Sequence, residues 1–208
     1  MVTEQAPRQS RPLAAFDFDG SLTVRDSFGR FLRWRAGEAR WAAGLVAMVP
    51  AFVAYGLDRD RGRLKAAAVR VFLRGASVES VTRDAEAFAD VHRERFFRPD
   101  ALEAWARHGR EGDLRVIVTA SPELTVRPFA ERLGADRLIG TRLALDAQGR
   151  IAGALQGENC RGEEKVRRLR DLLGADVRLV AAYGDTSGDR EMLAMAERPG
   201  YRVFTARP

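Results

Sequence analysis

The sequence predicts an α/β fold with a mainly parallel central sheet, because short apolar runs alternate with segments of helical periodicity. The first run, residues 13–18, is apolar on both faces, as expected for a central strand covered by helices on both sides. Similar runs predict strands at residues 114–119 and 177–183, and a fourth at residues 201–205. Helical patterns separate these runs, at residues 123–133, 163–173 and 188–197.

Two segments interrupt this alternation. Residues 24–99 have helical periodicity and few strand signals, which predicts a helical cap inserted after the first strand. Residues 141–155 read as two short strands around a polar turn, which predicts a small β-hairpin flap. We therefore expect an α/β core of residues 13–23 and 100–208 that carries an inserted helical cap.

The composition is that of an ordinary globular chain, with 46% hydrophobic and 31% charged residues among 208. The single cysteine, Cys160, cannot form an internal disulfide, which favours the cytoplasm. Residues 1–12 are polar, hold two prolines and have no apolar stretch like that of a signal peptide, so we expect a disordered arm. The net charge of +6 accompanies no nucleic-acid-binding motif, and we expect an anionic substrate or membrane surface rather than nucleic acid.

Two carboxylates, Asp17 and Asp19, stand two residues apart where the first predicted strand ends. Residues at this spacing point to the same side of an extended chain. Gly20 follows, and glycine lets the backbone turn and approach a ligand closely. Because open parallel sheets bind ligands beyond the carboxyl ends of their strands, the pair is predicted to face a binding crevice. Acidic residues are also common in plain turns, so the pair does not decide the function by itself.

The next two predicted strands also end in polar groups. Thr119 ends the second strand, where its hydroxyl can donate to a phosphate oxygen or cap the following helix. Asp185 and Asp189 follow the third strand, where they can line the same crevice or stabilise a helix start. Four carboxylates at one end of a sheet repel one another unless a cation lies between them, and all-oxygen ligands predict Mg²⁺.

The order of these motifs is more specific than any one of them. Asp-x-Asp-Gly-Ser at residues 17–21 precedes Thr119, then Lys165, then Gly-Asp-x-x-x-Asp at residues 184–189. This set resembles the haloacid dehalogenase superfamily of phosphatases, and the resemblance implies a Rossmann-like core. The helical insert and the lysine-containing segment 159–166 resemble the branch that holds phosphoserine phosphatases and phosphatidylglycerophosphatase-C-like lipid phosphatases.

The resemblance implies a role for each matching residue. Asp17 is expected to attack phosphorus and become an aspartyl phosphate, while Asp19 serves as acid for the leaving alkoxide and then as base for water. Thr119 and Lys165 are expected to hold the phosphate, with Arg161 as an alternative to Lys165. The substrate-binding positions implied in addition are Gly20, Ser21, Asp26, Ala120 and Arg161.

The resemblance also implies a Mg²⁺ site at this end of the sheet. Asp17, the backbone carbonyl of Asp19, and Asp185 are expected to hold the ion, and Asp189 to orient the lysine and the metal-bound waters. One metal ion and one lysine suit phosphoryl transfer, because that reaction mainly demands positioning and charge neutralisation.

Three positions depart from the phosphoserine phosphatase pattern. Asp26 falls where those enzymes bind the substrate amine, but it also suits the N-cap of a helix that begins near Ser27. Val69 stands where they place a cap arginine, and Gly188 replaces the asparagine before the last aspartate of the set. These departures weaken the case for phosphoserine as the substrate.

Residues 41–57, from Trp41 to Leu57, form an uncharged run of 17 residues with Pro50 near its middle and arginines on both sides. The run is at the short limit for a membrane span. An interfacial or re-entrant helix pair and a cap helix buried in protein are the alternatives. The flanking arginines would attract anionic lipid, so we expect peripheral contact with the inner face of the membrane.

The function predicted from the sequence is hydrolysis of a phosphate monoester with Mg²⁺ as cofactor. A lipid phosphate such as phosphatidylglycerophosphate is the first candidate substrate, and a small soluble phosphate such as phosphoserine is the second. A non-catalytic phosphate-binding module is the alternative from another class, although such a module has no need of both Asp17 and Asp19.

Overall fold

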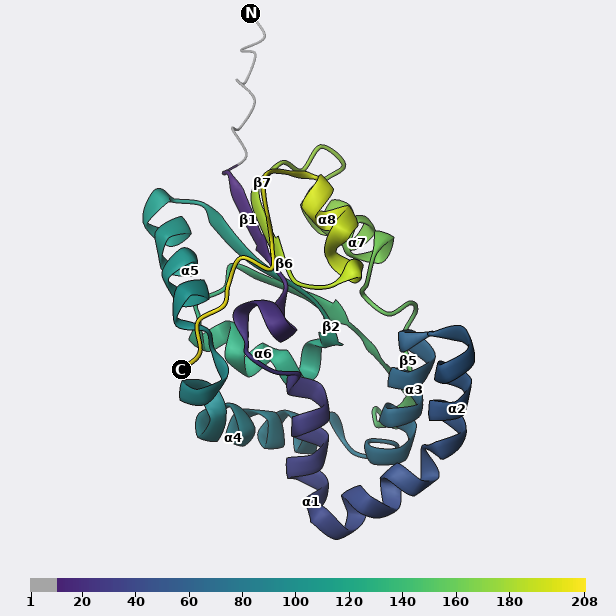
Figure 1. Cartoon of the computed structure of the whole chain (residues 1–208). Coiled ribbons are helices and arrows are strands. Elements are labelled where there is room, and N and C mark those ends of the chain that lie inside the picture. Colours follow the sequence, from purple (N-terminus) through teal and green to yellow (C-terminus); the bar gives the residue numbers. More distant parts are fainter. Residues whose placement is uncertain (1–10) are drawn as a thin grey trace, which may run out of the picture.

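The computed structural model describes residues 11–208, so all but the last two residues of the predicted N-terminal arm lie outside the described residues (Figure 1). Within this range, five strands form one sheet in the order β3-β2-β1-β6-β7, and every neighbouring pair is parallel. The predicted α/β class with a mainly parallel sheet is confirmed. The strands are β1 (Leu13–Phe16), β2 (Leu114–Pro122), β3 (Arg137–Thr141), β6 (Leu179–Gly184) and β7 (Ala196–Tyr201).

Helices cover both faces of the sheet (Figure 1). Alternation along β1 sends Ala14 and Phe16 into one cluster of buried residues and Leu13 and Ala15 into another. The first cluster packs under α4 (Val78–Phe96), α5 (Pro99–Glu111) and α6 (Glu123–Arg132). The second packs under α7 (Glu163–Leu173) and α8 (Arg190–Ala194). Burial on both faces explains why β1 is apolar throughout.

Five helices, α1 to α5, lie between β1 and β2 in the chain, and we call the first four, α1 to α4, the helical insert. The first three are α1 (Ser27–Ala47), α2 (Val49–Asp58) and α3 (Arg61–Phe72). The antiparallel hairpin of β4 (Leu143–Leu145) and β5 (Ile151–Leu155) has the predicted form. It is tied to the insert, because Gly75 N donates to the Ile151 carbonyl at 2.8 Å and Ile151 N donates to the Ala76 carbonyl at 2.9 Å.

The uncharged run of residues 41–57 is split between α1 and α2. The break falls at Met48, and Pro50 lies in the first turn of α2, where its missing N–H costs no helical hydrogen bond. By length and composition, no single helix of the described chain suffices to cross a membrane. The α1–α2 pair, bent by 53° at its break, meets that criterion when taken together.

Some predicted element bounds are wrong. The first strand ends at Phe16, and Phe18 begins a tight turn, Phe18–Leu22. The helix predicted at residues 188–197 is only Arg190–Ala194. The last strand is residues 196–201 rather than 201–205, and residues after it cross to α5, where Asp100 accepts hydrogen bonds from the backbone N–H groups of Thr205 and Ala206. The edge position of this strand accommodates Pro199 and its charged neighbours.

Candidate active site

The loop that follows β1 carries Asp17 at the centre of the sheet's carboxyl end. Its backbone N–H donates to the Tyr183 carbonyl of β6 at 2.8 Å, so the neighbouring strand holds the loop in place. Gly20 has a φ of +89°, and a side chain there would meet the Asp185 carboxylate. Glycine is therefore required at this position for both conformation and space.

Lys165 projects from the first turn of α7 into the interior, with only 1% of the residue exposed. Its ammonium donates to Asp17 Oδ1 at 2.6 Å, to Asp189 Oδ1 at 2.6 Å and to the Val118 carbonyl at 2.7 Å. These three bonds use all the protons of the ammonium. Of the two basic residues considered from the sequence, it is therefore Lys165 that lies against the buried carboxylates.

Arg161 points elsewhere. Its guanidinium donates to the hydroxyls of Thr186 at 3.2 Å and Ser187 at 2.8 Å, on the loop after β6. It still lines the pocket over Asp17.

Asp19 is held by two donors, neither of which is Lys165. Ser27 N donates to Oδ1 at 2.6 Å, and Ser121 Oγ donates to Oδ2 at 2.5 Å. The Asp19 carboxylate thus does not join the other predicted metal ligands, and only its carbonyl remains for the metal role that the resemblance implied. Thr119, on β2, accepts from Ser121 N at 3.0 Å and lines the same pocket.

Asp185 and Asp189 follow β6. Asp189 closes a capping box with Thr186, and its Oδ2 accepts from Thr186 N at 2.9 Å and from Asp185 N at 3.2 Å. Carboxylate oxygens of Asp17, Asp185 and Asp189 lie within 4.8 Å of one another. Asp185 Oδ1 is buried and has no hydrogen-bond partner within residues 11–208. A partnerless buried carboxylate oxygen beside two further carboxylates fits a hard cation such as Mg²⁺.

The electrostatics of the cluster follow from its burial. Burial raises the pKa of Asp17 to about 7, although Lys165 opposes the rise. Burial likewise raises the pKa values of Asp19 and Asp185. Burial also acts to raise the pKa of Asp189, but Lys165 outweighs it and the net shift is downward. A cation among these oxygens would favour their ionised forms.

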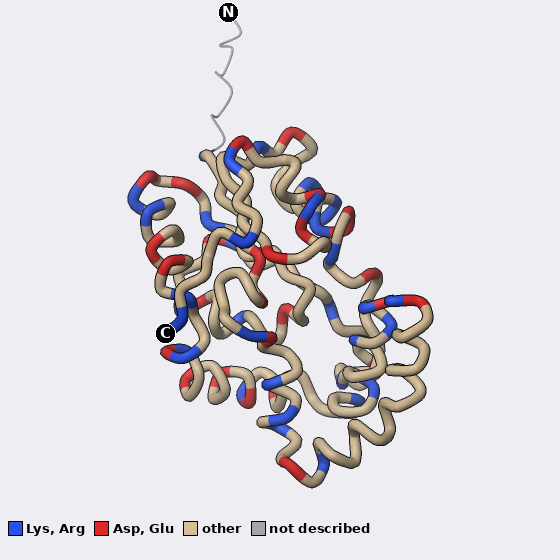
Figure 2. The backbone as a smooth tube through the Cα atoms, in the orientation of Figure 1, with Lys and Arg blue, Asp and Glu red and all other residues tan. Residues whose placement is uncertain are grey.

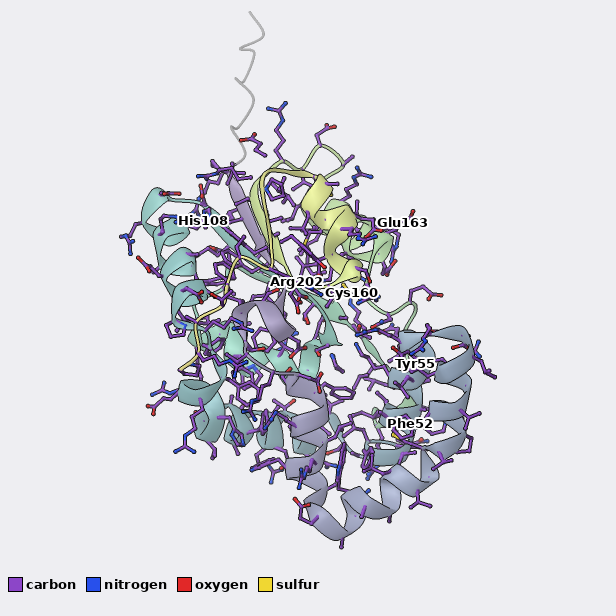
Figure 3. All side chains as sticks on the ribbon, viewed as in Figure 1. Phe52, Tyr55, His108, Cys160, Glu163 and Arg202 are labelled. Atoms are coloured by element: carbon purple, nitrogen blue, oxygen red, sulfur yellow. The ribbon has the colours of Figure 1, made fainter. Side chains whose placement is uncertain are left out.

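A pocket of about 440 Å³ opens over Asp17 and Asp19. Its floor is polar, whereas much of its wall is apolar and comes from the helical insert. The apolar residues of this wall are Phe28, Leu32, Trp41, Leu45, Met48, Phe52, Leu64, Ala68 and Phe72. Phe52 is labelled on α2 in Figure 3. The pocket can therefore hold an anionic group at its floor and an apolar group beside the insert.

The other residues singled out from the sequence are placed as follows. Asp26 caps α1 by accepting from Gly29 N at 2.7 Å, and it also lines the pocket, so both readings of this residue remain open. Ser21 is buried. The Ala120 carbonyl accepts from Thr141 Oγ1 at 2.6 Å. Val69 is buried in the core and is not part of the pocket lining.

Three residues near the site were not identified from the sequence, namely Lys65, Ser121 and Asn159. Ser121 stands two positions after Thr119, and that spacing on a strand was a usable signal. Lys65 comes from α3 of the insert and donates to Asn159 Oδ1 at 3.0 Å. Nothing in the local sequence distinguishes Lys65 from the arginines around it. Cys160, labelled in Figure 3, is buried, and burial raises the pKa of its thiol to about 11.

Comparisons with known proteins identify the family and the fold. The model of the haloacid dehalogenase-like hydrolase family matches residues 14–194. The chain is 58% identical to Protein CicA of Caulobacter vibrioides (strain NA1000 / CB15N) over 196 residues, which are 94% of this chain and 88% of that protein. A solved structure from Bordetella pertussis Tohama I, described as a protein with unknown function, superposes with a TM-score of 0.74 at 23% identity over 89% of this chain and 87% of that one. A phosphoserine phosphatase structure, described as a phospho-aspartyl intermediate analogue, shares the fold with a TM-score of 0.58 at 19% identity over 90% of this chain and 84% of that one.

Proposed function

The chain belongs to the haloacid dehalogenase-like hydrolase family, and we propose that it is a Mg²⁺-dependent phosphate monoester hydrolase that works through an aspartyl phosphate on Asp17. One observation carries the proposal. The buried Asp17 carboxylate accepts a hydrogen bond from Lys165 at the floor of a pocket. It lies beside Asp185 Oδ1, which has no hydrogen-bond partner within residues 11–208. This arrangement supplies a nucleophile, a fixed cation and a metal position to one phosphoryl group.

The residues divide the reaction between them. A carboxylate oxygen of Asp17 attacks phosphorus as the bond to the leaving alcohol breaks, and Asp19 gives its proton to that leaving oxygen. Asp19, now ionised, takes a proton from water, whose oxygen attacks phosphorus and frees Asp17 and inorganic phosphate. The Thr119 hydroxyl would donate to the transferred group, and the positive charge of Lys165 beside Asp17 would attract it. A bound Mg²⁺, held by Asp17, Asp185 and the Asp19 carbonyl with Asp189 beside them, would neutralise charge on the phosphoryl oxygens.

We expect the purified protein to hydrolyse p-nitrophenyl phosphate with Mg²⁺, to lose that activity in EDTA and to regain it when Mg²⁺ is restored. The physical reason is that a divalent cation would offset the charge of the clustered carboxylates and of the phosphoryl oxygens. Phosphate release measured over a Mg²⁺ titration tests this. Undiminished hydrolysis after complete removal of divalent ions would contradict the metal site, whereas no hydrolysis with Mg²⁺ would favour a non-catalytic phosphate-binding module.

For the substrate, we propose a lipid phosphate such as phosphatidylglycerophosphate. The support is the apolar wall that the insert places above the catalytic carboxylates. A small soluble phosphate such as phosphoserine is the second candidate, favoured by the carboxylate of Asp26 in the pocket lining. In either case we propose that residues 24–99 act as a cap over the core of residues 13–23 and 100–208.

The outer face of the α1–α2 pair supports contact with a membrane. Val46 is 72% exposed, Val53 is 62% exposed and Leu57 is 85% exposed, and Val49 continues the same stripe. Figure 2 shows α2 free of charged residues until its end, with basic residues beyond it. We propose that this stripe lies on the inner face of the cytoplasmic membrane, where it would carry the pocket to a lipid headgroup.

Pelleting with anionic liposomes tests the membrane proposal. We expect the wild-type protein to sediment with vesicles at low salt and less so at high salt, because the attraction of arginines to anionic lipid is screened. Changing Val46, Val49, Val53 and Leu57 to serine should weaken vesicle binding at least about tenfold, since each apolar side chain contributes about 1 kcal/mol or more when it leaves water.

A matched control removes exposed apolar side chains from other faces of the protein. The residues Val91, Leu172 and Val203 are at least half exposed, and their change to serine should leave vesicle binding unaltered. If the wild-type protein stays in the supernatant, or both variants lose binding equally, the stripe is not a membrane contact.

A further inference from the structure

Two cations of α3 face the pocket without an acidic partner. The ammonium of Lys65 donates to the Ala120 carbonyl and, at 3.0 Å, to Asn159 Oδ1, and both acceptors are neutral. Two bonds leave one of its three protons free. Arg61 stands one helical turn earlier and also lines the pocket, and the guanidinium has no hydrogen bond or ion pair within the described part of the chain.

Two nearby cations, Arg63 and Lys165, do have carboxylate partners. On the same helix, Arg63 pairs with Asp58 at 2.6 Å. At the floor of the pocket, Lys165 pairs with both Asp17 and Asp189. Removing a cation from water is costly unless an anion compensates, and burial lowers the pKa of Lys65 to about 8. The charges of Asp19 and Asp26 oppose this fall without forming an ion pair with Lys65, so the two cations of α3 can accept an anion from a ligand.

The position of Lys65 indicates that this anion belongs to the leaving group of the substrate. Lys65 donates to the carbonyl of Ala120, the neighbour of Ser121, whose hydroxyl holds Asp19. Asp19 is the proposed acid for the leaving oxygen, so Lys65 lies on the leaving-group side. Lys165, which would attract the transferred phosphoryl group, lies against Asp17 instead.

The same helix continues into the apolar wall. Beyond the two cations, Leu64, Ala68 and Phe72 line the pocket together with residues of α1 and α2. A molecule bound in the pocket can therefore contact the acid Asp19, the two cations and an apolar surface.

We propose that Arg61 and Lys65 form an anion subsite that binds a second negative group on the leaving alcohol, between the reacting phosphate and an apolar tail. This inference rests on the proposed hydrolase function and refines its substrate class. The substrate is a phosphate monoester whose alcohol carries a phosphodiester or a carboxylate. A lipid such as phosphatidylglycerophosphate has the phosphodiester, whereas phosphatidate has the tail without it.

Four substrates test separately the second anion and the apolar tail of the proposed substrate. Dioctanoyl phosphatidylglycerophosphate carries the second anion and a tail, dioctanoyl phosphatidate only the tail, phosphoserine only a second anion, and p-nitrophenyl phosphate neither. We expect kcat/KM for the first to exceed that for phosphatidate at least tenfold. Lys65→Met and the more exposed Arg61→Gln should each reduce this ratio at least fivefold, mainly by raising KM. The equally basic Arg70, on the same helix but outside the pocket lining, provides the control, and Arg70→Gln should leave the ratio unchanged.

The outcomes are distinct. Equal rates on the two lipids, or a loss in both variants that is the same for every substrate, would overturn the subsite and leave Lys65 as a structural contact between α3 and the core. A phosphoserine preference over p-nitrophenyl phosphate that Lys65→Met removes would support the subsite with a carboxylate as its anion. Failure to hydrolyse even p-nitrophenyl phosphate with Mg²⁺ would refute the hydrolase itself, which is a different result.

Discussion

Asp17→Asn is expected to abolish turnover of p-nitrophenyl phosphate, with a loss in kcat on the order of 10⁴-fold or more, while the fold is kept. The asparagine amide has nearly the shape of the carboxylate, and its oxygen can still accept from Lys165, as Asp17 Oδ1 does at 2.6 Å. It cannot form an acyl phosphate, because the amide is a poor nucleophile at phosphorus. Steady-state phosphate release and the circular dichroism of the variant provide the measurement.

Asp19→Asn is the matched comparison, because it makes the same chemical change two residues away. Loss of a proton shuttle slows a reaction by about 10² to 10⁴-fold, so this variant should keep measurable turnover. With p-nitrophenyl phosphate, Asp19→Asn should slow phosphoryl transfer to Asp17 less than it slows the later attack by water. Nitrophenolate is a weak base and leaves without a proton. Near-normal turnover by Asp17→Asn would mean that another residue is the nucleophile.

The central strands could be predicted because burial on both faces requires apolar residues along their sequence. β1, β2 and β6 lie at or next to the middle of the sheet, are covered by helices on both faces and are therefore mostly apolar. The edge strands β3 and β7 have no long apolar run. β7 (AERPGY) is mostly polar and holds a proline, and only its pairing with β6 makes it a strand.

The candidate site divides in the same way. Asp17, Asp19, Thr119 and Asp185 follow or end predicted strands, so a parallel sheet brings them to one edge without further information. Lys65 could not be identified, because its position depends on how α3 packs across the pocket. The sequence marks α3 only as an amphipathic helix with basic residues on several faces.

The uncharged run of residues 41–57 could be interpreted in three ways for a physical reason. An uncharged, apolar run is expected to be buried, but its composition does not indicate whether protein or lipid covers it. In the structure one side of the α1–α2 pair lines the pocket, through Trp41, Leu45 and Phe52, while Val46, Val53 and Leu57 face outward. The run therefore has two apolar sides, and the sequence pattern alone does not separate them.

Lys165→Met is expected to lower the free energy of unfolding by about 3–5 kcal/mol at pH 8 in metal-free protein, and to abolish turnover. The ammonium is buried and bonds two buried carboxylates, so its removal leaves Asp17 and Asp189 without a cation. Urea unfolding in EDTA measures the change. Arg167→Met on the same helix is the control, because its side chain is 59% exposed and surface ion pairs contribute about 1 kcal/mol or less.

The pH dependence of this loss identifies its cause. Burial already raises the pKa of Asp17 to about 7, and without Lys165 the pKa values of Asp17 and Asp189 should both rise. A carboxyl whose pKa is higher in the folded than in the unfolded protein binds its proton more tightly when folded. Its stabilising effect is complete below the unfolded pKa, near 4, and is lost as pH rises through the folded pKa. The variant should therefore be closest to wild type at pH 5 and furthest from it at pH 8. A loss of the same size at both pH values would attribute the destabilisation to packing around the shorter side chain rather than to uncompensated charge.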